Sequence, residues 1–494
     1  MLLSRLLQAL PDTYVGDIED VEIADLAYDS RQVRPGSLFI AVPAVRGGVR
    51  SGGYAFIAEA LSRGAVAVVA QHGIDRVPVP AVLVSDARAA LADMAVEFFD
   101  HPTSRLQLFA VTGTDGKTTT TFLLEQVLRA AGYLTGLIGT VQTTIGPRVL
   151  PNSDRMTTPE SLDLQRLFHT MVQANVTHAV MEASSHALEL QRLRGCRLTA
   201  CGLTNVTADH VEFHGSWERY YLAKQRLFTD IGAGRLAVLN RDDPTFERLR
   251  RVTVGATLSY SVKREADLYA TDVVSELDHT SFSLHHGGAV ASTRIALPGL
   301  FNVSNALAAA GLAQAAGLTL DIIAEGLARS KAPPGRFHRV RAGQPFEIVV
   351  DYAHTKNAFA SVLATVRAAT PPPRHVIAVF GAAGNRDRDK RPVLARLARR
   401  YADFFIVTNE DPCDEPAENI MAEIAAGLPP EEEGDRFIRE PDRGRAIRRA
   451  LSLAQRGDAV VILGKGHEQS IVVQGRKEPW SDVAAVQEAL GAHV

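Results

Sequence analysis

The stretch FAVTGTDGKTTTTFLL, residues 109–124, decides the fold because it joins an apolar strand to a helix through a glycine-rich turn. Glycine lets backbone N–H groups approach an anion closely, and a helix that begins at Lys117 adds partial positive charge. Lys117 would contact the β- and γ-phosphate oxygens of a nucleotide, and the Thr118 hydroxyl would hold Mg²⁺. Val111 replaces the first glycine of the pattern GxxxxGK[ST], so a fortuitous strand–helix turn is the alternative interpretation.

Apolar strand segments alternate with amphipathic helical segments on either side of this turn. The strand segments, each followed by a helical stretch, are LQLFAVTG, GLIGT, THAVMEAS, TACGLTNV and RLAVLN. Such alternation predicts a mostly parallel sheet covered by helices. A polar, β-rich passage follows at about 257–299, and then a helix at about 303–317.

Two breaks in this pattern divide the chain. The polar segment DHPTSR begins at residue 100, and SKAPPGR marks a boundary near residue 332. A chain of 494 residues is too long for one ordinary core. The prediction is three α/β domains: a small N-terminal unit (1–100), a central P-loop-type unit with a mostly parallel sheet (101–332), and a C-terminal Rossmann-like unit (333–494).

Composition limits the partners. A net charge of −3 with a pI near 6.6 gives no bulk attraction to nucleic acid or to an anionic membrane. The three cysteines form no CxxC pair, which suits a reducing compartment. The short apolar start and the lack of an 18-residue apolar run favour a soluble, cytoplasmic protein.

Three further residues are candidates for chemistry. Glu182 follows an apolar strand, and His210 lies in a segment that follows another, where α/β sheets place ligand-binding groups. A lone glutamate or histidine is usually structural, but their positions beside the nucleotide loop favour Mg²⁺ binding, although histidine is an unusual ligand for so hard a cation. Lys224, in YYLAKQRLF, would ordinarily extend its ammonium to water.

Ordered motifs along nearly the whole chain resemble those of the Mur ligases, ATP-dependent amide-forming enzymes of peptidoglycan precursor synthesis. The motifs are LAYDSRQVRPGSLFIAV, TGTDGKTTT, MTTPES, MEASSHAL, TNVTADHVEFHGSWERYYLAKQRLF, LNRDDP, GLFNVSNALAA, PPGR, VDYAHTKNA, VFGAAGNRDRDKRP and ILGKGHEQ. Within the family, the chain is most similar to the members that add the third residue of the stem peptide. The resemblance makes residues 1–100 a UDP-sugar domain and residues 333–494 an amino-acid domain.

The resemblance also implies roles for individual residues. The catalytic set is Lys117, Lys224, His210 and Glu182. ATP would be bound by Gly113, Thr114, Asp115, Gly116, Lys117, Thr118, Thr119, Asn302, Asn305, Arg336, Asp351 and His354. The UDP-MurNAc-dipeptide would be bound by Ser30, Thr157, Thr158, Ser184 and Arg192. The incoming amino acid would meet Arg391, Glu410, Asp411, Pro412, Cys413, Gly464 and Glu468. Metal ligands would be Thr118, Glu182, His210 and Lys224, the last carbamylated by CO₂ to N6-carboxylysine.

The implied reaction is the ATP-dependent addition of a diamino acid to the D-glutamate of UDP-MurNAc-L-Ala-D-Glu through an acyl phosphate, with Mg²⁺ as cofactor. Its partners are small molecules, and we expect a monomer. Rival interpretations keep the fold for a folylpolyglutamate- or cyanophycin-type ligase, or make the chain a P-loop NTPase switch. The MTTPES and GKGHE motifs oppose the first, and Val111 opposes the second.

One loop departs from the family pattern. Where members that select meso-diaminopimelate typically have Asp-Asn-Pro-Arg, this chain has Glu410, Asp411, Pro412 and Cys413. A thiol cannot replace the donor fork with which arginine grips a carboxylate, so lysine or ornithine is favoured. An arginine from elsewhere, such as Arg386 or Arg388, could bind the distal carboxylate instead and would restore the preference for diaminopimelate. The segment 43–53 is also a poor match, and its nucleotide contacts stay undefined.

Overall fold

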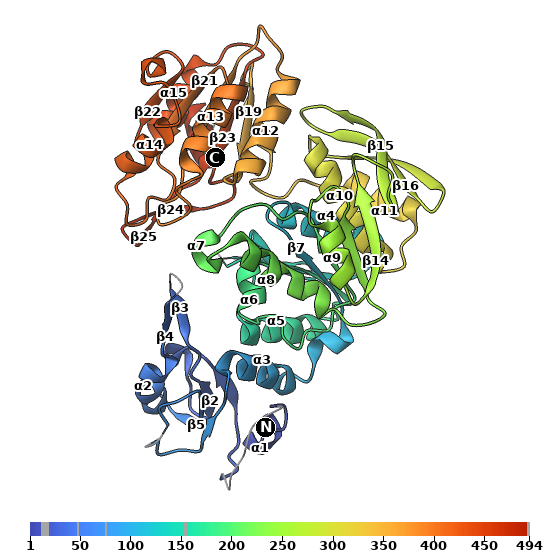
Figure 1. Cartoon of the computed structure of the whole chain (residues 1–494), viewed down its shortest axis with the longest axis vertical. Helices are drawn as coiled ribbons and strands as arrows, with labels where there is room; N and C mark the ends of the chain where they lie inside the picture. Colours follow the sequence, from blue (N-terminus) through green and yellow to red (C-terminus); the bar gives the residue numbers. More distant parts are fainter. Residues whose placement is uncertain (11–18, 47–48, 75–76, 153–155, 492–494) are drawn as a thin grey trace.

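The computed structural model describes residues 1–10, 19–46, 49–74, 77–152 and 156–491. Three sheets follow one another along the chain, and the central one lies between the other two (Figure 1). The strands of each sheet fall within one of the three expected ranges, with the first sheet between residues 25 and 83 and the second between 107 and 295. Residues 47 and 48 of the undefined segment lie outside the described residues.

The N-terminal sheet is parallel and has the strand order β1-β2-β5-β6. Its strands are β1 (Asp25–Ala27), β2 (Ser37–Ile40), β5 (Ala65–Ala70) and β6 (Ala81–Leu83), and a separate hairpin is made by β3 (Ala44–Arg46) and β4 (Val49–Ser51). Its helices are α1 (Leu3–Leu7), α2 (Ile57–Ser62) and α3 (Ala87–Phe98). Helix α3 packs against α5 (Ser161–Gln173) of the central domain and so joins the two domains.

The central sheet, within the described residues, has eleven strands in the order β10-β9-β8-β11-β7-β12-β13-β14-β15-β16-β17. Strands β8, β11, β7, β12, β13 and β14 are parallel, as the alternating pattern predicts, while both ends of the sheet are antiparallel. The strand bounds are β7 (Gln107–Thr112), β8 (Thr135–Ile138), β9 (Gln142–Ile145), β10 (Arg148–Pro151), β11 (His178–Glu182), β12 (Ala200–Leu203), β13 (Leu236–Asn240), β14 (Ala256–Ser261), β15 (Leu268–Ser275), β16 (Thr280–His286) and β17 (Ala289–Ile295).

Helices cover both faces of this sheet because side chains of a strand alternate between faces. In β7, Phe109 and Val111 pack toward α4 (Lys117–Ala130), α10 (Leu300–Gln314) and α11 (Leu320–Arg329). Leu108 and Ala110 pack on the opposite side, with α5, α6 (Ser185–Glu189), α8 (Trp217–Thr229) and α9 (Phe246–Val252). Strand β7 is therefore buried on both faces, and the loop after it is held by a rigid base.

The C-terminal sheet has the order β18-β19-β23-β20-β21-β22 and is parallel apart from β18. Its strands are β18 (His338–Arg339), β19 (Glu347–Asp351), β20 (Val376–Phe380), β21 (Phe404–Thr408), β22 (Phe437–Glu440) and β23 (Ala459–Leu463), with a hairpin of β24 (Ser470–Val473) and β25 (Arg476–Pro479). Its helices are α12 (Lys356–Ala369), α13 (Arg391–Tyr401), α14 (Ala417–Ala425), α15 (Arg443–Leu453) and α16 (Asp482–Ala489).

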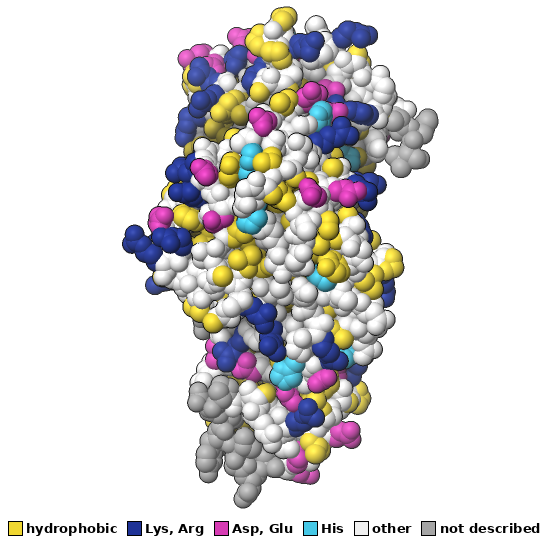
Figure 2. Space-filling model, turned by 90° about the vertical axis from the view of Figure 1, so that its right-hand side faces the viewer, with side chains coloured by type: hydrophobic (Ala, Val, Ile, Leu, Met, Phe, Trp, Pro, Cys, Tyr) yellow, Lys and Arg dark blue, Asp and Glu magenta, His cyan; other side chains and the backbone are white. Residues whose placement is uncertain are grey.

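The surface carries both signs of charge. On the face shown in Figure 2, basic and acidic side chains are interspersed along the length of the molecule. Among the described residues, no helix combines the length and apolarity needed to cross a bilayer.

Candidate active site

The phosphate loop lies between the end of β7 and the start of α4, and its two glycines are required by close contacts. Gly113 has a φ of +152°, and a Cβ there would lie 1.8 Å from Thr204 Oγ1. Gly116 has a φ of +87°, and its Cβ would lie 2.2 Å from Asn305 Oδ1. Both the backbone conformation and the space therefore exclude larger residues. Thr119 lies in the first turn of α4, buried beside the loop.

Two lysines converge on one carbonyl of this loop. Lys117 Nζ donates to Gly113 O at 2.8 Å and to Thr114 O at 2.9 Å, and Lys224 Nζ donates to Gly113 O at 2.7 Å. Lys224 is 2% exposed, and its ammonium lies 4.5 Å from the centre of the Tyr220 ring. It therefore does not extend to water. Burial, and then the neighbouring Lys117, hold the pKa of Lys224 well below its usual value, and burial also lowers the pKa of Lys117.

Glu182 ends β11 as a fully buried carboxylate beside the loop. It accepts hydrogen bonds from Thr118 Oγ1 at 3.0 Å, from Thr140 N at 2.8 Å and from Thr140 Oγ1 at 3.0 Å. The loop threonine and the strand-end glutamate are thus in direct contact, although they are 64 residues apart in sequence.

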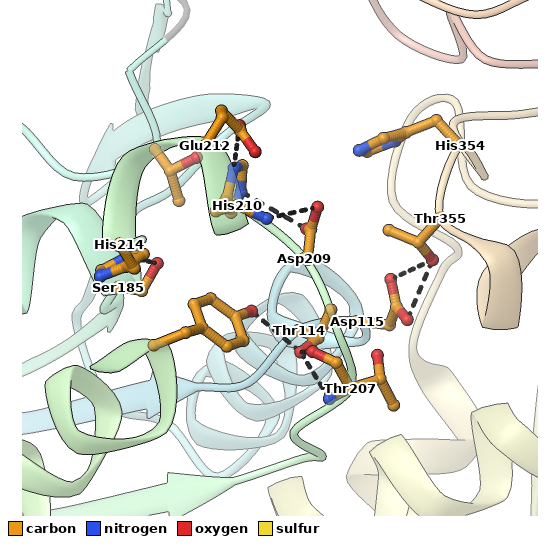
Figure 3. A network of polar contacts seen from close by, with 12 residues as sticks. Thr114, Asp115, Ser185, Thr207, Asp209, His210, Glu212, His214, His354 and Thr355 are labelled. Carbon is orange, nitrogen blue, oxygen red and sulfur yellow. Dashed lines mark hydrogen bonds and ion pairs between the residues drawn. The ribbon is translucent and has the colours of Figure 1, made fainter. Parts of the chain in front are cut away.

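His210 lies at the N-terminal cap of α7 (Val211–His214) with a φ of +52°. Its ring contacts the carboxylates of Asp209 at 3.4 Å and Glu212 at 3.5 Å (Figure 3). Close by, His214 Nε2 lies 3.1 Å from Ser185 Oγ, and burial lowers the pKa of His214 to about 4. Among the described residues, His210 forms no hydrogen bond or ion pair with Glu182, and its ring pairs with the neighbouring carboxylates instead.

Side chains from the C-terminal domain reach the loop across the domain boundary. Thr355 Oγ1 donates to the Asp115 carboxylate at 2.9 and 3.1 Å (Figure 3). Arg336 Nη2 donates to Thr118 Oγ1 at 3.2 Å, and the guanidinium lies 4.7 Å from the Tyr352 ring centre. Burial raises the pKa of Asp115. The nucleotide loop is therefore in contact with two domains.

The other residues expected at the nucleotide have separate partners. Asn302 Nδ2 donates to Pro298 O at 2.8 Å, and Asn305 Nδ2 donates to Asn302 Oδ1 at 3.2 Å. Asp351 accepts from the backbone N–H groups of residues 337 and 353, at 2.6 and 2.7 Å, so it fixes the chain at the domain entry. Burial lowers the pKa of His354 to about 3, which keeps the ring neutral.

The residues expected at the nucleotide sugar lie around the end of β11. Thr158 Oγ1 donates to Glu182 O at 2.8 Å and accepts from Ser184 N at 3.1 Å, and Arg192 Nη1 donates to Thr158 O at 2.8 Å. Thr157 Oγ1 accepts from Thr140 Oγ1 at 3.0 Å. Ser30 lies apart in the N-terminal domain, where its hydroxyl donates to Glu59 at 2.7 Å.

The structure corrects the placement of Arg391. Its side chain is fully buried, and its guanidinium donates to Glu415 at 2.8 Å, to Glu423 at 2.7 Å and to Ala383 O at 3.2 Å. A guanidinium bonded in this way inside the domain is not available to the incoming amino acid. Arg388 is also engaged, by Glu423.

In the loop 410–413, which differs from the family pattern, Glu410 and Asp411 are also not two free carboxylates. Asp411 accepts from Lys465 Nζ at 2.9 Å and from Val472 N at 2.8 Å, and Lys465 also bonds Glu468. Glu410 is 6% exposed, and its Oε2 accepts no hydrogen bond from the described residues.

Close packing encloses this loop. A Cβ on Gly464 would lie 2.6 Å from Glu410 Oε2, and one on Gly384 would lie 1.9 Å from Pro412 O. Burial raises the pKa of Glu410, which disfavours its anionic form. The argument for an ammonium partner is thereby weakened.

Two basic residues lie near this loop: Arg386, which the sequence already offered as a replacement arginine, and Lys390, which was not singled out from the sequence. Arg386 is exposed, has no hydrogen bond or ion pair with any described residue, and lowers the pKa of the Cys413 thiol against the effect of burial. Lys390 is 7% exposed, and its charge acts on Asp209, Glu410 and His354, so it lies between the histidine loop and the amino-acid loop. The sequence signal that could have identified Lys390 is the basic run NRDRDKRP, which follows a buried strand after a short glycine-containing turn.

The side chains expected to bind Mg²⁺ differ in how well their donor atoms suit this ion. Thr118 and Glu182 offer a hydroxyl and a carboxylate in contact with each other, which are the hard oxygen ligands this ion takes. Lys224 offers no oxygen ligand as an amine, but as a carbamate it would offer two oxygens. His210 is the weakest member, since it is a nitrogen ligand whose ring faces other carboxylates. The residues beside the loop therefore fit the ion.

A strand, a glycine-rich loop and a helix, flanked by a buried carboxylate and contacted by a second domain, form the arrangement expected of a nucleotide-dependent ligase. Comparison with known families agrees: residues 111–313 match the Mur ligase middle domain, and residues 335–466 match the Mur ligase glutamate ligase domain. The chain belongs to the Mur ligase family, and it is an ATP-dependent ligase.

Individual relatives within the family have names that describe a particular ligase activity. The chain is 44% identical to the UDP-N-acetylmuramyl-tripeptide synthetase of Roseiflexus sp. over 95% of its length and 94% of the relative. It is 42% identical to the UDP-N-acetylmuramoyl-L-alanyl-D-glutamate–2,6-diaminopimelate ligase of Geobacillus thermodenitrificans over 99% of both chains. A solved structure of a ligase of the latter name aligns with a TM-score of 0.70 and 30% identity, covering 100% of this chain and 99% of the other.

Proposed function

We propose that this protein joins a diamino acid to the D-glutamate of UDP-MurNAc-L-Ala-D-Glu at the expense of ATP. The observation that carries the proposal is the contact of the phosphate loop with the C-terminal domain, through Thr355 and Arg336. A loop held between two domains suits a reaction in which one domain presents the nucleotide and the other presents the amine. The names of the relatives support the choice of substrates.

The reaction has two steps. A γ-carboxylate oxygen of the substrate forms a bond to the γ-phosphorus of ATP, while the bond from that phosphorus to the ADP oxygen breaks. The amine of the diamino acid then attacks the carbonyl carbon of the acyl phosphate, loses a proton and expels inorganic phosphate. Lys117 would neutralise charge on the transferring group, and the Asp115–Thr355 contact would keep the domains closed and exclude water from the intermediate.

Mg²⁺ would be held by Thr118, Glu182 and the carbamate of Lys224, with His210 nearby. When bound, it supplies positive charge to the phosphate oxygens. The carbamate would form when the neutral Lys224 nitrogen attacks the carbon of CO₂ and releases one proton. Burial of the side chain beside the phosphate loop supports this modification, because its nitrogen bonds a backbone carbonyl and forms no ion pair with any described residue.

For the amino acid we propose meso-diaminopimelate, with Arg386 taking the place of the missing arginine at Cys413. Arg386 is exposed, unpaired among the described residues and close enough to affect the Cys413 thiol. A guanidinium binds a carboxylate through two parallel hydrogen bonds. The carboxylates of residues 410 and 411, which favoured lysine or ornithine, are buried or already bonded.

The test uses the purified protein with ATP, UDP-MurNAc-L-Ala-D-Glu and each of diaminopimelate, lysine and ornithine in turn. We expect ADP release and a product of the summed mass, and the highest kcat/KM with diaminopimelate. Arg386→Ala should lower kcat/KM for diaminopimelate at least tenfold, whereas the control Arg388→Ala should not. ADP release without acceptor and amine would refute the ligase reaction, and a preference for lysine would refute the role of Arg386.

A further inference from the structure

Two arginines from different domains share one buried carboxylate near the nucleotide-sugar residues. Arg88 Nη1 lies 3.1 Å from Glu160 Oε2, and Arg192 Nε lies 3.3 Å from Glu160 Oε1. Arg88 is on α3 of the N-terminal domain, while Glu160 and Arg192 belong to the central domain. The three side chains are 15%, 11% and 14% exposed, so water solvates little of their charge.

The charges in this cluster do not balance. Two guanidiniums and one carboxylate give these three side chains one net positive charge, and the carboxylates of Asp86 and Asp163 nearby bond Gln191 and Tyr28. The remaining bonds are to carbonyls: Arg88 Nη2 donates to Pro43 O at 2.6 Å, and Arg192 Nη1 donates to Thr158 O at 2.8 Å. Each guanidinium has five N–H donors, so both retain donors that no described residue accepts. A largely buried cation with spare donors is a receptor for an anion.

The position of the cluster indicates which anion. Pro43, which Arg88 holds, begins the segment 43–53 of the nucleotide-sugar domain, and Thr158, which Arg192 holds, contacts Ser184 beside Glu182. The substrate must cross this boundary between its uridine and its peptide. Its diphosphate lies at that crossing, next to the uridine, whereas its carboxylates lie at the peptide end.

We propose that Arg88 is a diphosphate-binding residue of the nucleotide-sugar site and that Glu160 orients it together with Arg192. The inference rests on the proposed function. Arg88 donates its free N–H groups to the diphosphate oxygens, and Glu160 keeps the two guanidiniums from repelling each other. The contact thereby joins the N-terminal and central domains around the bound substrate.

The test compares UDP with uridine, because the two ligands differ only in the diphosphate. Calorimetry on the full chain should show that Arg88→Met weakens UDP binding about tenfold to a hundredfold, the range for a charge-assisted hydrogen bond, and leaves uridine binding unchanged. The control Arg5→Met removes an equal charge from the same domain, at a side chain that is 60% exposed and paired with Glu97. This control should change neither UDP binding nor uridine binding.

Equal changes for UDP and uridine, or no change for UDP, would overturn the proposal and leave Arg88 a structural residue. If Arg88→Met does not fold, Arg88→Lys keeps the charge but loses the fork, and the same difference between UDP and uridine is expected. In turnover, Arg88→Met should raise KM for the nucleotide sugar and not KM for ATP. Failure of the wild-type protein to bind UDP at all would instead refute the proposed function.

Discussion

The charge of Glu182 can be separated from its structural contribution by the substitution Glu182→Gln. The carboxylate has three donors around it, the Thr118 hydroxyl and the N–H and hydroxyl of Thr140. Glutamine retains one oxygen for the Thr140 N–H, and its amide can donate to the two hydroxyls, which can rotate to accept. The polar atoms therefore remain paired in the variant.

The magnitude follows from these contacts. A hydrogen bond to a charged group contributes about 1.5–3 kcal/mol and a neutral one about 0.5–1.5 kcal/mol, so three bonds lose at most about 3–5 kcal/mol. Removing a fully buried charge also removes its desolvation cost of several kcal/mol, and this effect stabilises the variant. We expect the free energy of unfolding to change by less than about 2 kcal/mol, while kcat falls at least about a hundredfold through loss of Mg²⁺ and charge stabilisation.

The assay measures ADP release over a Mg²⁺ titration, together with denaturant unfolding. The matched control is Glu125→Gln, another buried glutamate in the same domain, which accepts from Thr135 Oγ1 at 2.6 Å. The control should lose stability by a similar amount but keep kcat and its Mg²⁺ dependence. If Glu182→Gln retains more than a tenth of the wild-type kcat with an unchanged Mg²⁺ requirement, Glu182 is not a metal ligand.

Three further substitutions address neighbouring features. Lys224→Ala should abolish ADP release, with partial recovery in added bicarbonate; full activity without rescue would exclude the carbamate. Thr355→Val removes the bond to Asp115 across the domain boundary, so kcat should fall about fivefold to tenfold with little change in melting temperature, and unchanged kcat would show that the contact does not hold the closed state. Because the pKa of His214 in the folded protein, about 4, lies below its unfolded value near 6.5, the unfolded chain takes up the proton first as pH falls. The destabilisation by His214 is therefore absent above about pH 6.5, grows as the pH falls to about 4 and stays constant below that. His214→Gln should reduce the loss of unfolding free energy between pH 7 and pH 5 by on the order of 1 kcal/mol, and identical pH dependence in denaturant melts would contradict this.

Local patterns predicted much of the architecture. The glycine-rich turn, the parallel central strands and the breaks near residues 100 and 332 are properties of consecutive residues, and three sheets lie within the predicted ranges. Contact of Glu182 with the phosphate loop was also predictable, because strand ends of a parallel sheet meet at one edge.

The partners of individual side chains were not predictable in this way. Arg391 was placed at the amino-acid site, yet Glu415 and Glu423 hold it inside the domain. Lys390, beside the same loop, was overlooked although it lies between two groups of functional residues.

The sequence alone determined the α/β class, and it predicted the glycine-rich turn and the three ranges within which the sheets lie. Only the tertiary structure decided which charges are free to meet a ligand. The 240 residues between Asp115 and Thr355, and the 72 between Arg88 and Glu160, show why. Secondary structure depends on near neighbours, whereas the burial and pairing of a charge depend on groups that only the folded chain brings within a few ångströms.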